Sequence, residues 1–165
     1  MAAFTENRLS ARLLALGNDL LGDDAFGLAV ARETRRRLGS QADIVATFAS
    51  GLDLLDSLLA VERLVVVDSI QTGTFEPGVI HVFREEMLHP AFGPSPHFCS
   101  IFDVLSMARE LGLNAASEVI FIAVEAADCA TVGGPMCQAV EAAIGPVTER
   151  VIDLLETKPA GVRYG

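Results

Sequence analysis

Apolar residues along this chain fall into short runs that alternate with stretches of helical period. Five runs rich in Val, Ile and Leu predict strands at about residues 12–16, 43–47, 63–68, 79–84 and 118–124. Apolar positions spaced three and four apart predict helices at about residues 24–38, 52–59, 98–111 and 135–156. Strands that alternate with helices in this way indicate the α/β class.

Two segments refine the predicted architecture. Residues 64–68 read LVVVD, which is apolar on both faces, as a central parallel strand requires. Residues 69–78 are too few for a crossover helix, so the strand near Val79 is predicted to pair antiparallel. We therefore expect a three-layer α/β/α sandwich with a mixed, mostly parallel five-stranded sheet. Gly145–Pro146 predicts a kink in the last helix.

Length and composition narrow the class of protein. The 165 residues suit one domain over 1–165, with residues 157–165 expected to form a frayed tail. A formal net charge of −10 disfavours nucleic acid and anionic membranes as partners. The sequence has no apolar run of membrane-spanning length and no apolar export signal near its start. Three cysteines without a CxxC pair fit a reducing cytoplasm, and the acidic composition favours a monomer.

Polar residues with chemical potential lie where the predicted strands end. Asp23 and Asp24 follow the first strand, Asp68 closes the run LVVVD, and His97 opens a later helix. Carboxyl ends of parallel strands meet at one edge of a sheet, where open α/β folds bind ligands. Two carboxylates and one imidazole form a ligand set that suits nickel or zinc. The sequence therefore predicts a metal-contacting site at this edge.

Each of these residues also has a purely structural interpretation. Asp23 is a suitable N-cap for the helix that follows it, and Asp68 could accept hydrogen bonds from backbone amides of the next turn. A lone histidine is more often structural than a ligand, and we treat His81 and His89 as structural or surface residues. Two of the three cysteines, Cys129 and Cys137, are expected to be small buried residues.

Several familiar catalytic motifs are absent from the sequence. It contains no GxSxG nucleophile elbow, no GxxxxGK[ST] phosphate loop, no GxGxxG dinucleotide turn and no HExxH zinc helix. These absences argue against α/β-hydrolases, P-loop proteins, Rossmann dehydrogenases and zincins.

Four segments resemble a known family in the order in which they occur. They read GNDLLGDDAFG at 17–27, VVVDSI at 65–70, SPHFCSIFDVL at 95–105 and IAVEAADCATVGGPMCQAVEAAIGPV at 122–147. These segments are similar to the nickel–iron hydrogenase maturation proteases, endopeptidases that trim the C-terminal extension from the hydrogenase large subunit. The opening segment is the most specific of the four. Unlike many members, this chain has FASGLDLL where the family often has a glycine-rich turn before its second helix.

The resemblance implies a site, a cofactor and a partner. The family's metal-contacting and catalytic positions fall on Asp24, Asp68 and His97, where Asp24 replaces a frequent glutamate. The partner would be the hydrogenase large-subunit precursor, which would itself present the nickel. We expect four further residues to contribute to substrate binding: Gly17, Asn18, Asp23 and Gly51.

The sequence leaves the attacking group and the activity class open. The metal could polarise the scissile carbonyl or generate a hydroxide, or one aspartate could act as general base on water in an aspartic-type peptidase. The alternatives to such a hydrolase are a non-cleaving, metal-dependent maturation chaperone and a peptidase of the germination-protease type.

Overall fold

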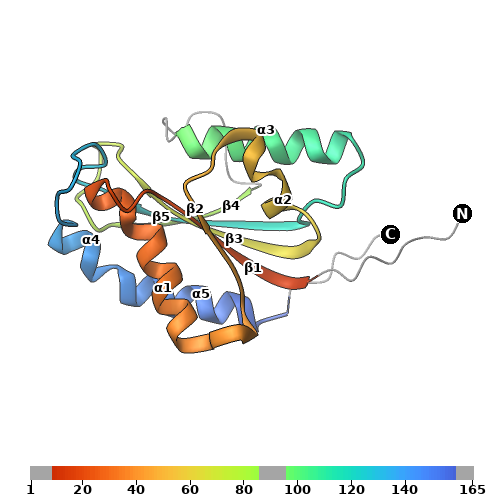
Figure 1. The fold of residues 1–165 in the computed structure, drawn as a ribbon, viewed down its shortest axis with the longest axis horizontal. Coiled ribbons are helices and arrows are strands. Elements are labelled where there is room, and N and C mark those ends of the chain that lie inside the picture. The colour runs from red at the N-terminus through yellow and green to blue at the C-terminus, as the bar shows by residue number, and fades with distance from the viewer. Residues whose placement is uncertain (1–8, 86–95, 159–165) are drawn as a thin grey trace, which may run out of the picture.

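A twisted five-stranded sheet forms the middle layer of the molecule (Figure 1). The computed structural model describes residues 9–85 and 96–158, and it describes only the backbone of residues 96–100. The strand order is β2-β1-β3-β5-β4. The strands are β1 (Leu9–Leu16), β2 (Asp43–Thr47), β3 (Val61–Ile70), β4 (Ile80–Arg84) and β5 (Glu118–Glu125). β4 pairs antiparallel with β5 and the other pairs are parallel, which confirms the predicted mixed sheet.

Helices cover both faces of this sheet (Figure 1). On one face lie α2 (Leu55–Leu58) and α3 (Pro96–Glu110), and on the other lie α1 (Phe26–Leu38), α4 (Gln138–Ala142) and α5 (Ile144–Glu156). Short 3-10 helices connect these elements, among them η1 (Gly22–Ala25), η2 (Gly39–Gln41) and η3 (Gly51–Leu54). The predicted α/β/α sandwich is confirmed. Within the described residues, no helix has the length and apolar character needed to cross a bilayer.

Central strand β3 supplies side chains to both apolar cores. Leu64 and Val66 pack on the side of α2 and α3, while Val65 and Val67 pack on the side of α1 and α5. All four are buried, as expected for a parallel strand covered on both faces. Their burial fixes the register of β3, because a slip of one residue would exchange the two faces. That register sets the position of Asp68 near the carboxyl end of the strand.

The last helix divides at Ala143, close to the predicted kink. Pro146 has no backbone N–H, so the carbonyl of Ala142 receives no helical hydrogen bond from it. The helix also tightens at this point, because the N–H of Ala143 donates to the carbonyl of Val140, three residues earlier, at 3.0 Å. The break separates α4 from the longer α5 (Figure 1). α4 lies beside the carboxyl edge of the sheet, and α5 packs along the face of the sheet.

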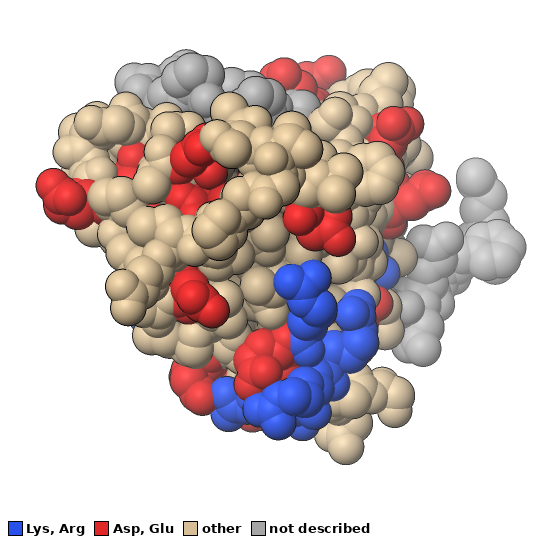
Figure 2. Space-filling model, turned by 60° about the vertical axis from the view of Figure 1, so that its left-hand side comes forward, with Lys and Arg blue, Asp and Glu red and all other residues tan. Residues whose placement is uncertain are grey.

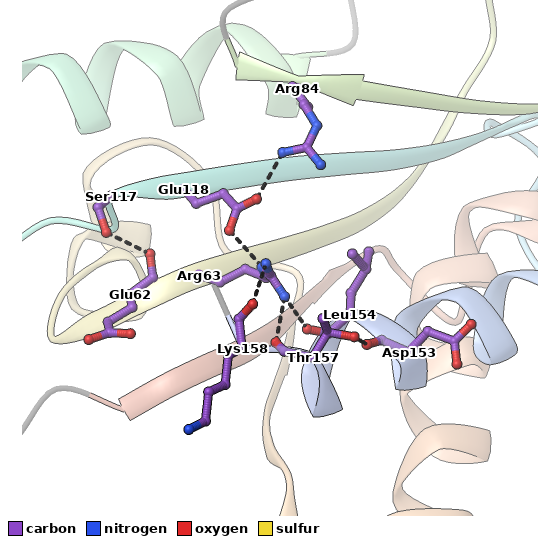
Figure 3. Close-up of polar contacts among 9 residues, drawn as sticks. All are labelled: Glu62, Arg63, Arg84, Ser117, Glu118, Asp153, Leu154, Thr157 and Lys158. Carbon is purple, nitrogen blue, oxygen red and sulfur yellow. Dashed lines mark hydrogen bonds and ion pairs between the residues drawn. The ribbon is translucent and has the colours of Figure 1, made fainter. Parts of the chain in front are cut away.

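A buried arginine anchors the chain at the amino edge of the sheet (Figure 3). Arg63 is only 5% exposed, and its Nε donates to Glu118 Oε2 at 2.7 Å. Its Nη1 donates to the carbonyls of Leu154 and Thr157 at 2.8 and 2.7 Å, and Nη2 reaches that of Lys158 at 3.4 Å. Arg63 thus holds the backbone of Thr157 and Lys158. Residues 159–165 lie outside the described residues, so the frayed tail over 157–165 stays a prediction.

Arg84 from β4 completes this network by donating to Glu118 Oε1 at 2.8 Å. Burial opposes the ionisation of Glu118, but the hydrogen bonds from Arg63 and Arg84 outweigh it and lower the pKa of that carboxyl. Both carboxylate oxygens thus have cationic partners.

Candidate active site

The turn after β1 is built by close backbone approach. A Cβ atom on Gly17 would lie 2.1 Å from the carbonyl oxygen of Asp24, and the φ of Gly17 is 151°. Only glycine fits there. The N–H of Asn18 donates to the same carbonyl at 3.2 Å, while Asn18 Oδ1 accepts from the N–H of Leu20 at 3.0 Å. Gly17 and Asn18, predicted to bind substrate, thus place the backbone of Asp24.

The final glycine of this motif brings helix α1 onto the sheet. A Cβ atom on Gly27 would lie 2.1 Å from the carbonyl oxygen of Leu16 and 2.8 Å from that of Val67. A side chain here would push the helix start away from β1 and β3. The spacing GNxLxxDDxxG therefore closes a turn and seats a helix, which leaves Asp24 at the carboxyl edge between these two strands.

Asp23 has a structural role other than the N-cap predicted for it. It is 1% exposed, and its carboxylate accepts hydrogen bonds from three backbone amides. Oδ2 accepts from Ala127 at 2.8 Å and Asp128 at 3.0 Å, and Oδ1 accepts from Cys137 at 2.6 Å. Asp23 is not an N-cap, because it lies inside η1. Its buried carboxylate holds the loop after β5, and a contribution of Asp23 to substrate binding stays a prediction.

Asp68 is a buried carboxylate with one satisfied oxygen. It is 1% exposed, and its Oδ1 accepts from the backbone N–H of Ser69 at 2.8 Å. Its Oδ2 is buried and has no hydrogen-bond partner among the described residues. Burial raises the pKa of Asp68 to about 8 against the effect of the Ser69 hydrogen bond, and the charge on Asp24 adds to the rise. Such an orphaned oxygen is costly unless a ligand satisfies it.

Asp24 is joined to the end of β3 through a hydroxyl group. Ser69 Oγ donates to Asp24 Oδ1 at 3.1 Å and lies 3.5 Å from Cys129 Sγ. Burial raises the pKa of the Cys129 thiol to about 11, although the Ser69 hydrogen bond opposes the rise. In the contact between Ser69 Oγ and Cys129 Sγ, either group can be the donor.

Ser69 and Cys129 were both missed by the sequence analysis. Cys129 is half-buried beside the acidic residues, so its prediction as a small buried residue is wrong, and Cys137 is likewise half-buried. The only signal for Ser69 was its place directly after Asp68. No pattern in the sequence linked Cys129 to it, since 60 positions separate the two residues.

Two further predicted site residues, Gly51 and His97, lie near the starts of η3 and α3. Gly51 has a φ of 60° at the start of η3, and no atom lies within 4 Å of where its Cβ would be. His97 belongs to the first turn of α3, but its side chain lies outside the described residues, as does all of His89. Asp24 and Asp68 are therefore brought together, while the contribution of His97 stays a prediction.

A third buried carboxylate shapes the loop between β3 and β4. Glu125 is fully buried, and its Oε1 accepts from the N–H groups of Thr72 and Gly73 at 2.8 and 3.0 Å. His81 Nε2 lies 3.6 Å from Glu125 Oε2, and the His81 ring contacts Phe75 at 4.8 Å between ring centres. Glu125 thus fixes this loop beside the site, while Nε2 of His81 is buried without a hydrogen-bond partner among the described residues.

The described residues do not form a metal site by themselves. Among them, no three His, Cys, Asp or Glu side chains are grouped closely enough to hold a metal ion. Asp24 and Asp68 offer carboxylate oxygens, and the orphaned Oδ2 of Asp68 is an acceptor that a cation would satisfy. This donor set suits a metal ion that is also bound by ligands from another molecule.

Comparison with known sequences identifies relatives over most of the chain. A family model described as hydrogenase maturation protease matches residues 29–154, a span that begins after Asp24 and includes Asp68 and His97. The hydrogenase expression/formation protein HupD of Bradyrhizobium diazoefficiens is 28% identical over 148 residues. That alignment covers 87% of this chain and 76% of HupD.

Solved structures with the same fold include two enzymes of this class. The hydrogenase maturating endopeptidase HybD from E. coli matches with a TM-score of 0.77 and 26% identity, covering 88% of this chain and 91% of its own. The [NiFe] hydrogenase maturation protease HybD from Thermococcus kodakarensis matches with a TM-score of 0.73 and 26% identity, covering 88% and 99%. The likeness thus extends to nearly the whole fold in both cases.

Proposed function

The chain belongs to the hydrogenase maturation protease family, and on that premise we propose that it cuts the C-terminal extension from a nickel-loaded [NiFe]-hydrogenase large-subunit precursor. The proposed substrate is the precursor protein, and nickel is part of that substrate. We propose further that the reaction takes place in the cytoplasm and that the enzyme acts as a monomer.

One observation carries the proposal for nickel. Asp68 Oδ2 is buried at the carboxyl edge without a hydrogen-bond partner among the described residues, and Asp24 lies close enough to raise the Asp68 pKa. A buried acceptor of this kind fits a site that is completed by a cation on its substrate. Asp24 and Asp68 would contact the nickel, with His97 as the third contact.

Nickel contact would position the bond to be cut. A metal held by the precursor's own ligands and by Asp24 and Asp68 would fix the scissile peptide beside these carboxylates. Hydrolysis then requires attack of water on the carbonyl carbon, cleavage of the C–N bond and transfer of the water proton to the leaving amine. Asp24, the half-buried carboxylate, would accept that proton, and the hydrogen bond from Ser69 would orient it.

Mass spectrometry of the precursor tests this function directly. The large-subunit precursor is incubated with the enzyme, once loaded with nickel and once with nickel withheld. We expect loss of one defined C-terminal peptide in the loaded sample alone. If a confirmed nickel-loaded cognate precursor stays intact, the protein is not this protease, and a stable complex in that sample would point to the non-cleaving chaperone.

Single substitutions test the residues assigned to the site. Asp24→Asn and His97→Ala should each lower the cleavage rate by at least about a hundredfold while the protein stays folded. Asp153→Asn is the matched control, because Asp153 is an exposed acid on α5 at the other end of the molecule. Full cleavage by both site variants would contradict the assignment, whatever the control does.

A further inference from the structure

The loops at the carboxyl edge of the sheet share an unusual chemistry. They follow β1, β2, β3 and β5 and comprise residues 17–25, 48–54, 71–79 and 126–137; together they are here termed the carboxyl-edge loops. They contain no Lys, Arg or His, although the chain has 12 Lys and Arg residues. Their acidic residues are Asp19, Asp23, Asp24, Asp53, Glu76 and Asp128.

The acidic side chains on the outside of these loops form no ion pair with a described residue. Asp19, Asp53 and Glu76 are exposed, and no ion pair found among the described residues includes any of them. Figure 2 looks toward this end of the molecule and shows Lys and Arg gathered in one cluster at the lower right. Among the residues that Figure 2 draws in colour, the upper left part of that face carries acidic and uncharged side chains, with acids in a hollow.

Large apolar side chains are exposed on the same loops. Phe48 is 80% exposed, Val132 is 74% exposed and Leu20 is 63% exposed. Leu20 and Val132 lie side by side, because the N–H of Gly133 donates to the carbonyl of Leu20 at 2.8 Å. Phe48 lies on the other side of the turn at Gly17. It directly follows Thr47, whose carbonyl accepts from the N–H of Gly17 at 3.2 Å. These apolar side chains therefore flank the turn that places Asp24.

We propose that the carboxyl-edge loops dock a basic and apolar surface of the large-subunit precursor around its cleavage site. This inference rests on the proposed function and adds the chemistry of the partner. A docking surface with acids and no cations attracts Lys and Arg side chains and speeds their approach. The exposed apolar residues supply the contacts that hold the partner after the encounter. The docked segment would extend to Asp68, whose buried Oδ2 has no hydrogen-bond partner among the described residues.

A pair of triple variants tests the charge. Asp19→Asn/Asp53→Asn/Glu76→Gln removes three acids from the carboxyl-edge loops. Glu62→Gln/Glu110→Gln/Glu156→Gln removes three exposed acids from elements that begin or end at the amino edge. Both change the formal net charge from −10 to −7. We expect kcat/KM for nickel-loaded precursor to fall about tenfold in low salt for the first triple variant and to stay within about twofold for the second.

A second pair of variants tests the apolar contacts. Phe48→Ser/Val132→Ser should raise KM for the nickel-loaded precursor about tenfold. Leu111→Ser is the matched control, because Leu111 is 67% exposed in the turn before β5 at the opposite edge. Thermal unfolding of every variant is followed by circular dichroism, so that a loss of folded protein is not mistaken for a loss of docking.

The outcomes separate this inference from the function on which it rests. If the wild-type protein does not cut the precursor, the proposed function fails and the inference fails with it. If the wild-type protein cuts, but the two triple variants behave alike or the apolar pair matches its control, the docking surface is wrong while the protease assignment stands. Losses confined to the carboxyl-edge variants, and weaker in 200 mM than in 20 mM salt for the charge triple, support the inference.

Discussion

The two edges of the sheet bury ionisable side chains in opposite ways. At the amino edge, Arg63 and Glu118 have partners for both oxygens of the carboxylate and for three nitrogens of the guanidinium (Figure 3). At the carboxyl edge, Asp68 is equally buried, yet its Oδ2 has no partner among the described residues, and its charged neighbour is another acid. The same strand, β3, supplies both Arg63 and Asp68.

This difference distinguishes a structural use of charge from a functional one. A buried ion with its hydrogen bonds complete holds chain segments together, and losing one partner is costly. A buried acid left incomplete lowers the stability of the free protein and gains its partner only when a ligand arrives. We therefore expect substitutions at the amino edge to change stability without changing chemistry, and substitutions at the carboxyl edge to change chemistry first.

The largest stability effect is expected at Arg63. Arg63→Ala would leave Glu118 with one cation and would free the carbonyls of Leu154 and Thr157, so the free energy of unfolding should fall by about 3–5 kcal/mol. Cleavage per folded molecule should stay near the wild-type rate. Urea denaturation and a cleavage assay on the native fraction measure the two effects. A large loss of activity in folded protein would break the distinction between the edges.

A glycine at each edge gives the next comparison. Gly17→Ala would force a Cβ to within 2.1 Å of the Asp24 carbonyl oxygen. We therefore expect the free energy of unfolding to fall by about 3 kcal/mol and cleavage to be lost. Gly112→Ala is the control, since Gly112 has a φ of 68° and open space around its Cβ position. It should cost about 1 kcal/mol and leave cleavage unchanged. Equal effects in unfolding and cleavage assays would refute the role of Gly17 in placing Asp24.

The smallest expected effects compare two serines. Ser69→Ala removes the donor to Asp24 Oδ1, which should cost about 1 kcal/mol of stability and lower kcat about three- to tenfold. Ser117→Ala removes a comparable hydrogen bond, donated to the carbonyl of Glu62 at 3.0 Å at the amino edge. It should cost similar stability with no change in kcat. Steady-state kinetics with thermal melts would show whether Ser69 orients Asp24 as proposed.

The fold was predictable from sequence because its signals are local. The all-apolar run before Asp68 marked the central strand, and the short segment before Val79 marked the antiparallel one. The exact start of α1 was not predictable, because the close approach of Gly17 to Asp24 turns residues 22–25 into a 3-10 helix. The hold of Arg63 on Leu154 and Thr157 was also missed, since Arg63 lies about 90 residues earlier.

The site was predictable only in part for the same reason. Asp24 and Asp68 could be found because each follows a predicted strand. Asp23 has the sequence signature of an N-cap, yet amides more than 100 positions away use its carboxylate. Contacts between distant segments, such as that of Ser69 with Cys129, leave no periodic trace in one sequence.

Asp68→Asn tests the central claim most directly, because it changes stability and chemistry in opposite directions. The folded pKa of about 8 lies above the ordinary value of 3.8, so the folded state keeps a proton that the unfolded state releases between about pH 4 and 8. The contribution of Asp68 to stability is therefore fully present below pH 4 and lost as the pH rises through 8, and asparagine removes that loss.

Unfolding of the wild-type protein and Asp68→Asn is measured in urea at pH 5 and pH 9, alongside cleavage of nickel-loaded precursor. We predict that the variant gains stability relative to the wild-type protein between the two pH values, by about 2–5 kcal/mol, while cleavage is lost. A variant that loses stability at pH 9, or one that still cuts the precursor, would contradict the claim that Asp68 is left incomplete for its substrate.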